Sequence, residues 1–580
     1  MKAESNNPGV FLWIIYEASM VRCQLFLFST LLSLWSIRPA SAESISSYLL
    51  AQALPATNPL QQALPNNQQP APTPTNETTP ESSKVLVRRI EVQGSTVLKP
   101  EEIQRITQPI EGKSATVEDL QSVADGITQL YLERGFITSR AILVDQTVKE
   151  GVVQIRVIEG SIETIEVRGL QHLREQYVRD RLQIGTKPPF NKNRLEDQLQ
   201  LLKADPLFET VEASLKPGEN LGQSILAIQI KEAAQLQGFI GADNFSPASV
   251  GSERFSTTVS YQNLARSGDE LSASYYRTAQ GGSNSFDFSY QLPVNAMNGV
   301  VQLRIAPSRG RIIAPNFSAF GIRSNTALHE ISYRQPLIRS PREELALSLG
   351  FTVQNGQTFL FQDTPFPFGI GADAEGNSRT RVLQFGQDYV RRDPRGAWVL
   401  RSQFNFGLNV FNATVNDSPI PDGRFFSWLG QVQRVQRLSN DHLLIAQAAI
   451  QLSPDSLLPS QQFIIGGGQT IRGFRQNARS GDNGFRVSVE DRITVQRNAA
   501  GLPVLQLVPF VDFGTVWNRS DNPNLLPSQR FLSSGGIGLI LEPIPRLTIR
   551  ADYAVPFVKL SDRGNNAQDQ GFTFSVGYRF

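Results

Sequence analysis

The segment "GFTFSVGYRF", Gly571–Phe580, decides the fold class of this 580-residue chain. Its apolar residues alternate strictly with small or polar residues, which is the two-residue period of a β-strand and not the period of a helix. One face of the predicted strand therefore carries only large apolar side chains, namely Phe572, Phe574, Val576, Tyr578 and Phe580. The other face carries Thr573, Ser575, Gly577 and Arg579.

The same alternation recurs through most of the chain after about residue 234, for example in "ELALSLGFTV" (344–353) and "LTIRADYAV" (547–555). Two structures fit alternating strands: a soluble sandwich or barrel with the apolar face inward, and a membrane barrel with the apolar face toward lipid. Segments of about nine or ten residues match a tilted membrane-crossing strand, and 40% hydrophobic residues are too few for a large two-layered core. Residues 235–580 are therefore predicted to form a transmembrane antiparallel β-barrel of about 16 strands, at about 20 residues per strand and connection.

The N-terminal segment 1–42 has the pattern of a secretory signal peptide. Arg22 supplies positive charge, Leu25–Ile37 form the apolar core, and "ASA" at Ala40–Ala42 is a small-residue cleavage site. About 13 apolar residues are too few to span a bilayer as a helix. Met20 is an alternative translation start, because the residues before it fit no part of a signal peptide.

Residues 43–84 are expected to form a short helix and a flexible linker. "SISSYLLAQAL", Ser44–Leu54, fits one short helix, and the segment that follows is rich in Pro, Gln, Asn and Thr. Such a composition cannot bury a core and favours an extended chain.

Residues 85–234 contain a repeat, because "IEVQG" at Ile90–Gly94 returns as "IEVRG" at Ile165–Gly169. In the first copy, Thr116 and Asp119 form a capping-box pattern, and Gly135 suits a helix C-cap. The residues between them with helical spacing are Val117, Leu120, Ala124, Ile127 and Tyr131. Each copy is predicted to be a small α/β module in the order β-α-α-β-β, over residues 85–160 and 161–234.

Bulk composition excludes several classes of function. The 55 basic and 53 acidic residues leave a net charge of +2, which argues against nucleic acid as a partner. The one cysteine, Cys23, precedes the predicted cleavage site, and the three histidines are scattered. "DFG" at Asp512–Gly514 lacks the other kinase motifs, and "GGG" at Gly466–Gly468 lacks the lysine of a phosphate loop. We therefore expect no enzyme, no cofactor and no metal site.

Motifs in both regions resemble one family. The two modules resemble POTRA domains, with "LYLERGF" and "IRVIEG" in the first and "ADPLFETVEASLKPG" in the second. The barrel region contains Ile471-Arg472-Gly473-Phe474 and then Phe510, Asp512 and Gly514, similar to the [VI]-R-G-[FY] and F-x-D-x-G motifs of the POTRA-containing outer-membrane assembly superfamily. Two POTRA domains are typical of its two-partner secretion branch, the hemolysin secretion/activation transporters. The resemblance covers residues 44–580, and "VEDR" at 489–492 departs from the expected asparagine-rich pattern.

The resemblance implies a site in the barrel lumen. Alternation in "LQLVPFVDFG" turns Leu505, Leu507, Val511 and Phe513 outward and Gln506, Asp512 and Gly514 inward. A carboxylate that faces the lumen needs a partner of opposite charge. Arginine is the strongest candidate, because it can form two parallel hydrogen bonds with a carboxylate. In the family, the loop that bears Arg-Gly-Phe folds into the lumen, so Arg472 is expected to dock on Asp512 and Gly473 to permit the turn. Phe580 resembles the assembly signal of bacterial outer-membrane barrels.

The resemblance also implies a function. The chain is expected to recognise an unfolded exoprotein, large and β-helical, through POTRA domains in the periplasm and to secrete it through a barrel in the outer membrane without nucleotide hydrolysis. Expected partners are this exoprotein, outer-membrane lipid, periplasmic chaperones and the barrel-assembly machinery. The Ser44–Leu54 helix is expected to plug the lumen at rest. Alternatives are an insertase that assembles other barrels and, less favoured, a passive porin.

Overall fold

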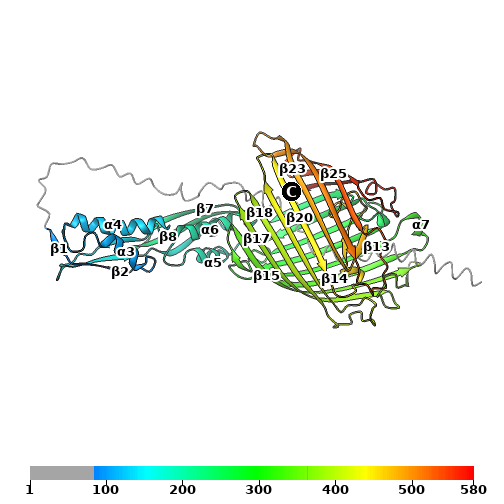
Figure 1. Ribbon diagram of the computed structural model, residues 1–580, viewed down its shortest axis with the longest axis horizontal. Coiled ribbons are helices and arrows are strands. Elements are labelled where there is room, and N and C mark those ends of the chain that lie inside the picture. The colour runs from blue at the N-terminus through cyan, green and yellow to red at the C-terminus, as the bar shows by residue number, and fades with distance from the viewer. Residues whose placement is uncertain (1–83, 362) are drawn as a thin grey trace, which may run out of the picture. The chain divides into compact units, whose positions relative to one another are not determined.

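The computed structural model describes residues 84–361 and 363–580. The signal peptide, the linker and the plug helix predicted from the sequence lie outside these residues. The described residues form two compact units, 84–234 and 235–580, which we describe separately (Figure 1).

The first unit begins with a small α/β domain. Its elements are β1 (Val85–Val87), β2 (Arg89–Gln93), α3 (Pro100–Thr107), β3 (Lys113–Ala115), α4 (Val117–Glu133), β4 (Arg140–Leu143) and β5 (Val152–Ile158). β5 is the central strand of a three-stranded sheet, parallel to β2 and antiparallel to β4. β1 and β3 form a separate antiparallel pair.

Helix α4 packs one face on this sheet. Its N-cap Thr116 and Asp119 form the predicted capping box, since each side chain accepts from the other residue's backbone N–H. Leu120, Ala124, Ile127 and Tyr131 are buried as predicted, but Val117 is 56% exposed. Val117 is the first helical residue, and it lies outside the stripe that covers the sheet.

The second domain has the order β-α-α-β-β, whereas the first domain adds the short pair of β1 and β3 to this order. Its elements are β6 (Ser161–Arg168), α5 (Glu175–Gly185), α6 (Lys192–Lys203), β7 (Phe208–Pro217) and β8 (Gln223–Glu232). β8 lies between a parallel β6 and an antiparallel β7. The two domains share backbone hydrogen bonds, from Phe190 N to Gly160 O (2.7 Å) and from Lys192 N to Gly135 O (2.9 Å), so they form one unit.

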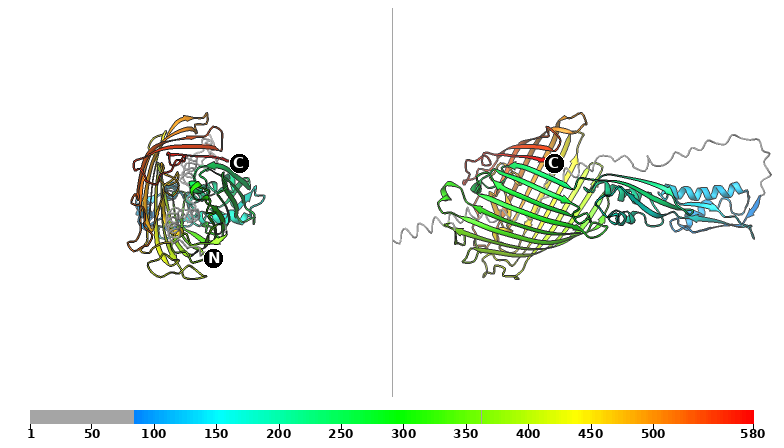
Figure 2. Two further views of the ribbon diagram at one scale, coloured as in Figure 1. Left: turned by 90° about the vertical axis from the view of Figure 1, so that its right-hand side faces the viewer. Right: turned by 180° about the vertical axis from the view of Figure 1, so that it is seen from behind.

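The second unit is a closed antiparallel barrel of 16 strands, as predicted (Figure 2). Its strands are β9 (Leu236–Asp243), β10 (Arg254–Gln262), β11 (Glu270–Thr278), β12 (Ser283–Pro293), β13 (Val300–Arg311), β14 (Arg323–Arg339), β15 (Glu343–Leu360), β17 (Asn377–Asp393), β18 (Gly396–Gly407), β19 (Phe425–Arg437), β20 (His442–Leu452), β23 (Asn483–Arg497), β24 (Pro503–Trp517), β25 (Phe531–Leu541), β26 (Leu547–Pro556) and β27 (Phe572–Arg579). The two-residue β16 (Thr364–Pro365) pairs with the end of β15. Among the described helices, none has the length and apolar character needed to cross a membrane.

The two faces of the barrel wall differ in chemistry. Large apolar side chains stand exposed on the outer face, for example Ile305, Ile331, Leu349, Ile537 and Tyr553. The inner face carries polar side chains that the structure buries, including Ser272, Ser289, Thr352, Gln354 and Gln403. This is the distribution of a barrel with lipid outside and a polar lumen.

The barrel closes between its last and first strands. Ser575–Arg579 of β27 pair with Phe239–Asp243 of β9. One residue further, Phe580 N donates to Gly238 O (2.9 Å) and Gly238 N donates to Phe580 O (3.0 Å). The Phe580 ring lies against Gly238, where an added Cβ would come within 2.1 Å of Cζ. Phe580 therefore extends the closing seam.

Candidate functional site: a loop anchored in the barrel lumen

The connection between β20 and β23 folds into the barrel. We call residues 453–482 the lumenal loop. Its two arms form a short hairpin of β21 (Phe463–Ile465) and β22 (Arg479–Gly481). Between the arms, the tip carries the Ile471–Phe474 motif, which is buried throughout. The loop thus presents the motif to the inner wall.

Arg472 and Asp512, the two residues that the family resemblance names as a docking pair, lie in direct contact. The guanidinium donates from Nε to Oδ2 (2.7 Å) and from Nη2 to Oδ1 (2.8 Å), the two-bond geometry that arginine forms with a carboxylate. The Arg472 backbone N–H also donates to Oδ2 (3.0 Å). Arg472 is 4% exposed and Asp512 1%, so the pair is shielded from bulk water.

The pair belongs to a larger ionic network. Nη1 of Arg472 donates to Glu490 on β23 (2.9 Å), and Ser488 on the same strand donates to Asp512 (2.6 Å). Glu490 also accepts from Arg492 and Arg550 (3.0 Å each), and Arg550 pairs with Asp552 (2.9 Å). The three arginines and three carboxylates of this network sum to zero charge, so the loop inserts its cation without leaving net charge in the network.

Apolar contacts surround the charged pair. The Arg472 guanidinium carbon lies 3.4 Å from the centre of the Phe510 ring, a cation–π contact on the strand that bears Asp512. Ile471 and Phe474 join a buried cluster with Phe463, Val516 and Leu532. The loop tip is therefore held by packing on both sides of the ion pair.

Two glycines allow this close approach. Gly473 has φ of +87°, and a Cβ there would lie 3.1 Å from the Ala554 methyl carbon. At Gly514, a Cβ would lie 2.5 Å from the Phe485 carbonyl oxygen and 2.9 Å from Ile471 Cδ1. The bare backbone at Gly514 thus makes room for the loop on β24.

A second set of contacts holds the arm of the loop that leads to β22. Arg475 donates to Asp569 (3.2 Å), Gln476 N to Gln568 (3.0 Å) and Arg479 to Asp562 (2.9 Å), all in the connection between β26 and β27. The loop is therefore tied to the segment that leads directly into the closing strand.

Asp482 fixes the base of the loop. It accepts from the backbone of Leu457 (2.9 Å) and Arg519 (3.2 Å) and from the Asn522 side chain (2.7 Å). Burial raises the pKa of this carboxyl, and these hydrogen bonds counteract only part of the rise. The side chain organises the loop through neutral donors, without an ion pair among the described residues.

Sequence reasoning found only part of this site. Arg472, Gly473, Phe474, Asp512 and Gly514 come together in the structure, whereas Phe580 lies apart at the seam. Ser488, Glu490 and Arg550 were missed as partners. The sequence did contain a pattern that points to Ser488 and Glu490. Residues 488, 490 and 492 alternate onto one face of β23, and all three are polar.

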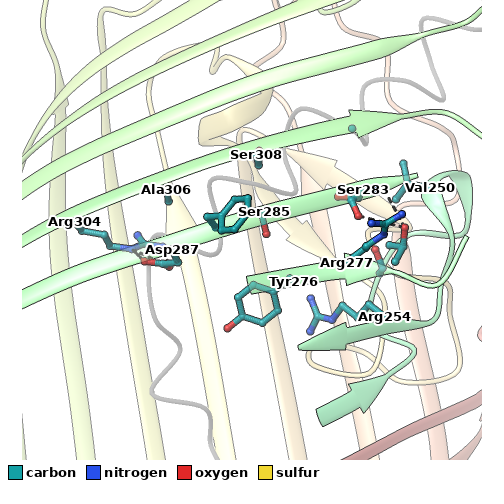
Figure 3. A pocket seen from close by; sticks show the side chains of 14 residues that line it. Val250, Arg254, Tyr276, Arg277, Ser283, Ser285, Asp287, Arg304, Ala306 and Ser308 are labelled. Carbon is teal, nitrogen blue, oxygen red and sulfur yellow. Dashed lines mark hydrogen bonds and ion pairs between the residues drawn. The ribbon is translucent and has the colours of Figure 1, made fainter. Parts of the chain in front are cut away.

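The opposite wall of the lumen is also charged and polar. A pocket between β10 and β13 is lined by Arg254, Tyr276, Asp287, Arg304 and several serines (Figure 3). Arg304 pairs with Asp287 (2.6 Å), and Arg254 pairs with Asp243 (2.6 Å). Over the described residues, no group of three His, Cys, Asp or Glu side chains is arranged to hold a metal ion.

The barrel, its anchored loop and the two α/β domains define a class, the POTRA-containing transporters and assembly proteins of the outer membrane. A family model described as haemolysin secretion/activation protein ShlB/FhaC/HecB matches residues 222–541, and a model of the ShlB-type POTRA domain matches 85–160. The chain belongs to the ShlB/FhaC/HecB family, which is a family of transporters and not of enzymes. Its barrel lies in the outer membrane and its POTRA domains in the periplasm.

Similar proteins agree with this assignment. The outer membrane transporter CdiB of Escherichia coli is 24% identical over 78% of this chain and 76% of its own length. The haem/hemopexin transporter protein HuxB of Haemophilus influenzae is 22% identical over 82% and 83%, and the hemolysin transporter protein ShlB of Serratia marcescens 24% over 76% and 78%.

Solved structures show the same fold. The structure of CdiB from Escherichia coli covers 93% of this chain and 97% of its own, with a TM-score of 0.69 and 21% identity. BamA from Haemophilus ducreyi, lacking POTRA domains 1–3, reaches a TM-score of 0.52 at 18% identity.

Proposed function

We propose that this chain secretes an unfolded exoprotein, that the POTRA unit is the receptor for this client, and that transport proceeds without nucleotide hydrolysis. The relatives transport through the outer membrane, and the names of three of them refer to hemolysin or to haem and hemopexin. A secreted partner of the same kind follows for this chain by family.

The free strand edges of the POTRA unit carry this proposal. Among the described strands, β7 pairs only with β8, and it leaves a ten-residue edge open. An extended client adds to such an edge through main-chain hydrogen bonds, with little demand on its sequence. Glu209, Glu212 and Lys216 on β7 keep the edge soluble while it is empty.

The lumenal loop supplies the gate in this proposal. Its anchors are side-chain hydrogen bonds and ion pairs, whereas the wall is held by backbone ladders. The loop can therefore leave the wall while the barrel stays closed. Folding of the client outside the cell then prevents its return.

Recognition is tested by photo-crosslinking in cells that express the chain together with the large exoprotein encoded by the adjacent gene. A crosslinker at Glu212 on β7 should capture the client, and one at Gln183 on the exposed surface of α5 should not. Equal crosslinking at both positions would show that β7 is not the specific receptor for the client.

Secretion is tested in liposomes that contain the purified full chain and no nucleotide. The proposal requires that the unfolded client becomes protected from protease. The insertase alternative, which has the fold similarity to BamA in its favour, predicts instead the insertion of many unrelated barrels. A porin predicts solute flux alone.

A further inference from the structure

Three arginines stand on the outer surface of the barrel at the ends of β11 and β13, the two strands that flank β12. We call Arg277 on β11 and Arg309 and Arg311 on β13 the rim arginines; all three are exposed. β9 follows the periplasmic unit directly, so its start faces the periplasm and its end at Asp243 faces the cell exterior. The ladder from Asp243 through Arg254 to Thr278 places Arg277 at the exterior end, where β13 also ends.

The strand register places the rim arginines on the outer face of the wall, and Arg277 also borders the pocket of Figure 3 near the β11–β12 turn. Arg277 and Arg309 both lie opposite Asn284, and Arg277 also lies opposite the exposed Phe255. Two residues further into the membrane on the same face, the rings of Tyr275 and Phe286 contact each other at 4.7 Å. Side chains two residues apart on a strand share a face.

These rings mark the depth of the rim arginines in the bilayer. Aromatic side chains of membrane barrels gather where the hydrocarbon core meets the lipid headgroups. Tyr275, Phe286 and Phe288 form such a group, with the exposed Ile305 directly opposite Phe288. Arg277 and Arg309, two residues outward from Tyr275 and Phe286, therefore lie at the level of the lipid phosphates, and Arg311 lies two residues further out.

The described part of the chain supplies no counter-charge to the three rim arginines themselves. Within the described residues, none of the rim arginines makes an ion pair or a side-chain hydrogen bond. Glu253, the carboxylate next to β10, accepts from Ser252 and pairs with no arginine of the described chain. Asp287 and Glu330 of the same wall lie near Arg304 in the lumen.

One cross-strand pair of arginines shows the excess of positive charge at the rim. Arg311 lies directly opposite Arg323, and like charges in such positions are destabilising. Asp363 pairs with Arg323, and among the described residues no carboxylate pairs with Arg311. An external anion at the rim would remove this repulsion.

We propose that the rim arginines bind the phosphate groups of a phosphorylated glycolipid in the outer leaflet of the membrane. Arg277 and Arg309 flank Asn284, so their Cα atoms lie about 10 Å apart across two strand spacings. Guanidinium groups at this separation reach two phosphates on one headgroup and bind each through charge-assisted hydrogen bonds. The bound lipid fixes the first strands of the barrel, next to the closing seam, to the leaflet.

The test measures binding of fluorescent bis-phosphorylated lipid A to the purified full chain in neutral detergent micelles. Arg277→Ser/Arg309→Ser/Arg311→Ser should weaken binding by about tenfold or more, which corresponds to about 1.4 kcal/mol. The matched control Arg339→Ser/Arg342→Ser/Arg391→Ser makes the same charge change at the periplasmic end and should leave binding unchanged. Lysine at the three rim positions should retain most of the affinity, since an ammonium also binds phosphate.

Two further measurements test whether the lipid phosphates are what the protein binds. The wild type should bind the same lipid without its phosphates much more weakly, and inorganic phosphate should compete poorly. Equal affinity for the two lipids, an unaffected serine variant, or full competition by inorganic phosphate would each overturn the proposal. If the serine variant fails the heat-modifiability test of folding, the lysine variant and the lipid comparison on the wild type decide.

Discussion

Arg472 occupies a position that other cations fill poorly. Its planar fork meets both oxygens of Asp512 while a third nitrogen reaches Glu490 and the flat face rests on Phe510. A lysine ammonium is a single point charge and cannot make the two parallel bonds and the stacking contact together. The site therefore selects the residue type through shape as well as charge.

A double-mutant cycle on Arg472 and Asp512 should reveal strong coupling. Removal of one partner leaves a charge without its counter-ion, at a cost of about 3–5 kcal/mol where burial is complete and less in a wet lumen. We expect Arg472→Ala to release the lumenal loop and reduce secretion, Arg472→Lys to rescue poorly, and the double variant to be less than additive. Protease cleavage near Gly473 reports loop release.

The matched control for this cycle is Arg304→Ala. Arg304 also forms a buried ion pair in the lumen, with Asp287, but it does not contact the loop. Loop protection should stay at the wild-type level in this variant. Strictly additive effects at residues 472 and 512 would show that the two side chains do not act as a lock.

Gly514→Ala should displace the loop tip more than Gly473→Ala does. The new methyl group at residue 514 meets a backbone oxygen at 2.5 Å, and such overpacking costs about 1–3 kcal/mol. At residue 473 the contact of 3.1 Å is milder, and the cost of positive φ is about 1–2 kcal/mol. Gly356→Ala on β15, where the nearest contact is 3.5 Å, should change neither protease access nor secretion.

At the scale of the elements, periodicity predicted most of the fold. Two-residue alternation identified the barrel, and the closed ring of 16 strands matches the expected number. The helix over Val117–Glu133 was predicted with its cap, but its first residue was placed in the core by spacing alone. Spacing gives the buried stripe of a helix and does not say at which residue the neighbouring sheet ends.

The site was less predictable because it joins distant elements. Alternation turned Asp512 inward, and the family motif named Arg472. Neither could place Glu490 or Arg550, because that depends on how far the loop reaches across β23–β26. Loop paths are set by tertiary contacts, and local periodicity gives no information about these contacts.

The POTRA unit should lose stability as pH falls below 4.5. Burial alone would raise the pKa of Glu159, but hydrogen bonds from Thr96 and Tyr131 hold it below the ordinary 4.5, and the backbone of residues 171–173 does the same for Glu232. Because both folded-state pKa values are lowered, the stabilisation is complete above the ordinary value and is lost as pH falls through the folded values.

Urea unfolding of residues 84–234 as a function of pH measures this loss. Glu159→Gln and Glu232→Gln should lower the free energy of unfolding at neutral pH and flatten its dependence on acid. Glu101→Gln, on the exposed surface of α3, should leave the profile as it is. An unchanged pH dependence in both test variants would show that Glu159 and Glu232 do not cause the loss of stability in acid.

At the scale of the whole molecule, closure of the barrel depends on one short seam. An open edge in lipid would leave backbone groups unpaired. Phe580 adds two backbone hydrogen bonds to this seam and covers Gly238 with its ring. These contacts are independent of any role of the residue as an assembly signal.

Deletion of Phe580 should therefore lower the yield of folded barrel without affecting export to the periplasm. Heat-modifiable mobility on gels measures the folded fraction. Phe580→Tyr should restore it, because the ring and the backbone bonds remain. Phe572→Ala removes an exposed aromatic at the other end of the same strand and should be tolerated. Equal yields with and without Phe580 would refute this role of the seam.

Division of labour between the two units gives the last prediction. The POTRA unit has two buried clusters of its own, and the barrel closes through its own strands without any strand from residues 84–234. Removal of residues 85–230 should therefore leave a barrel that folds and conducts ions in planar bilayers. Secretion should stop, because the proposed receptor edge on β7 is gone. A variant that keeps the whole unit but carries Arg179→Ala on α5 controls for changes in expression. Normal amounts of exoprotein in the medium after the deletion would mean that the client reaches the lumen without the POTRA unit, and the barrel alone would then have to carry recognition.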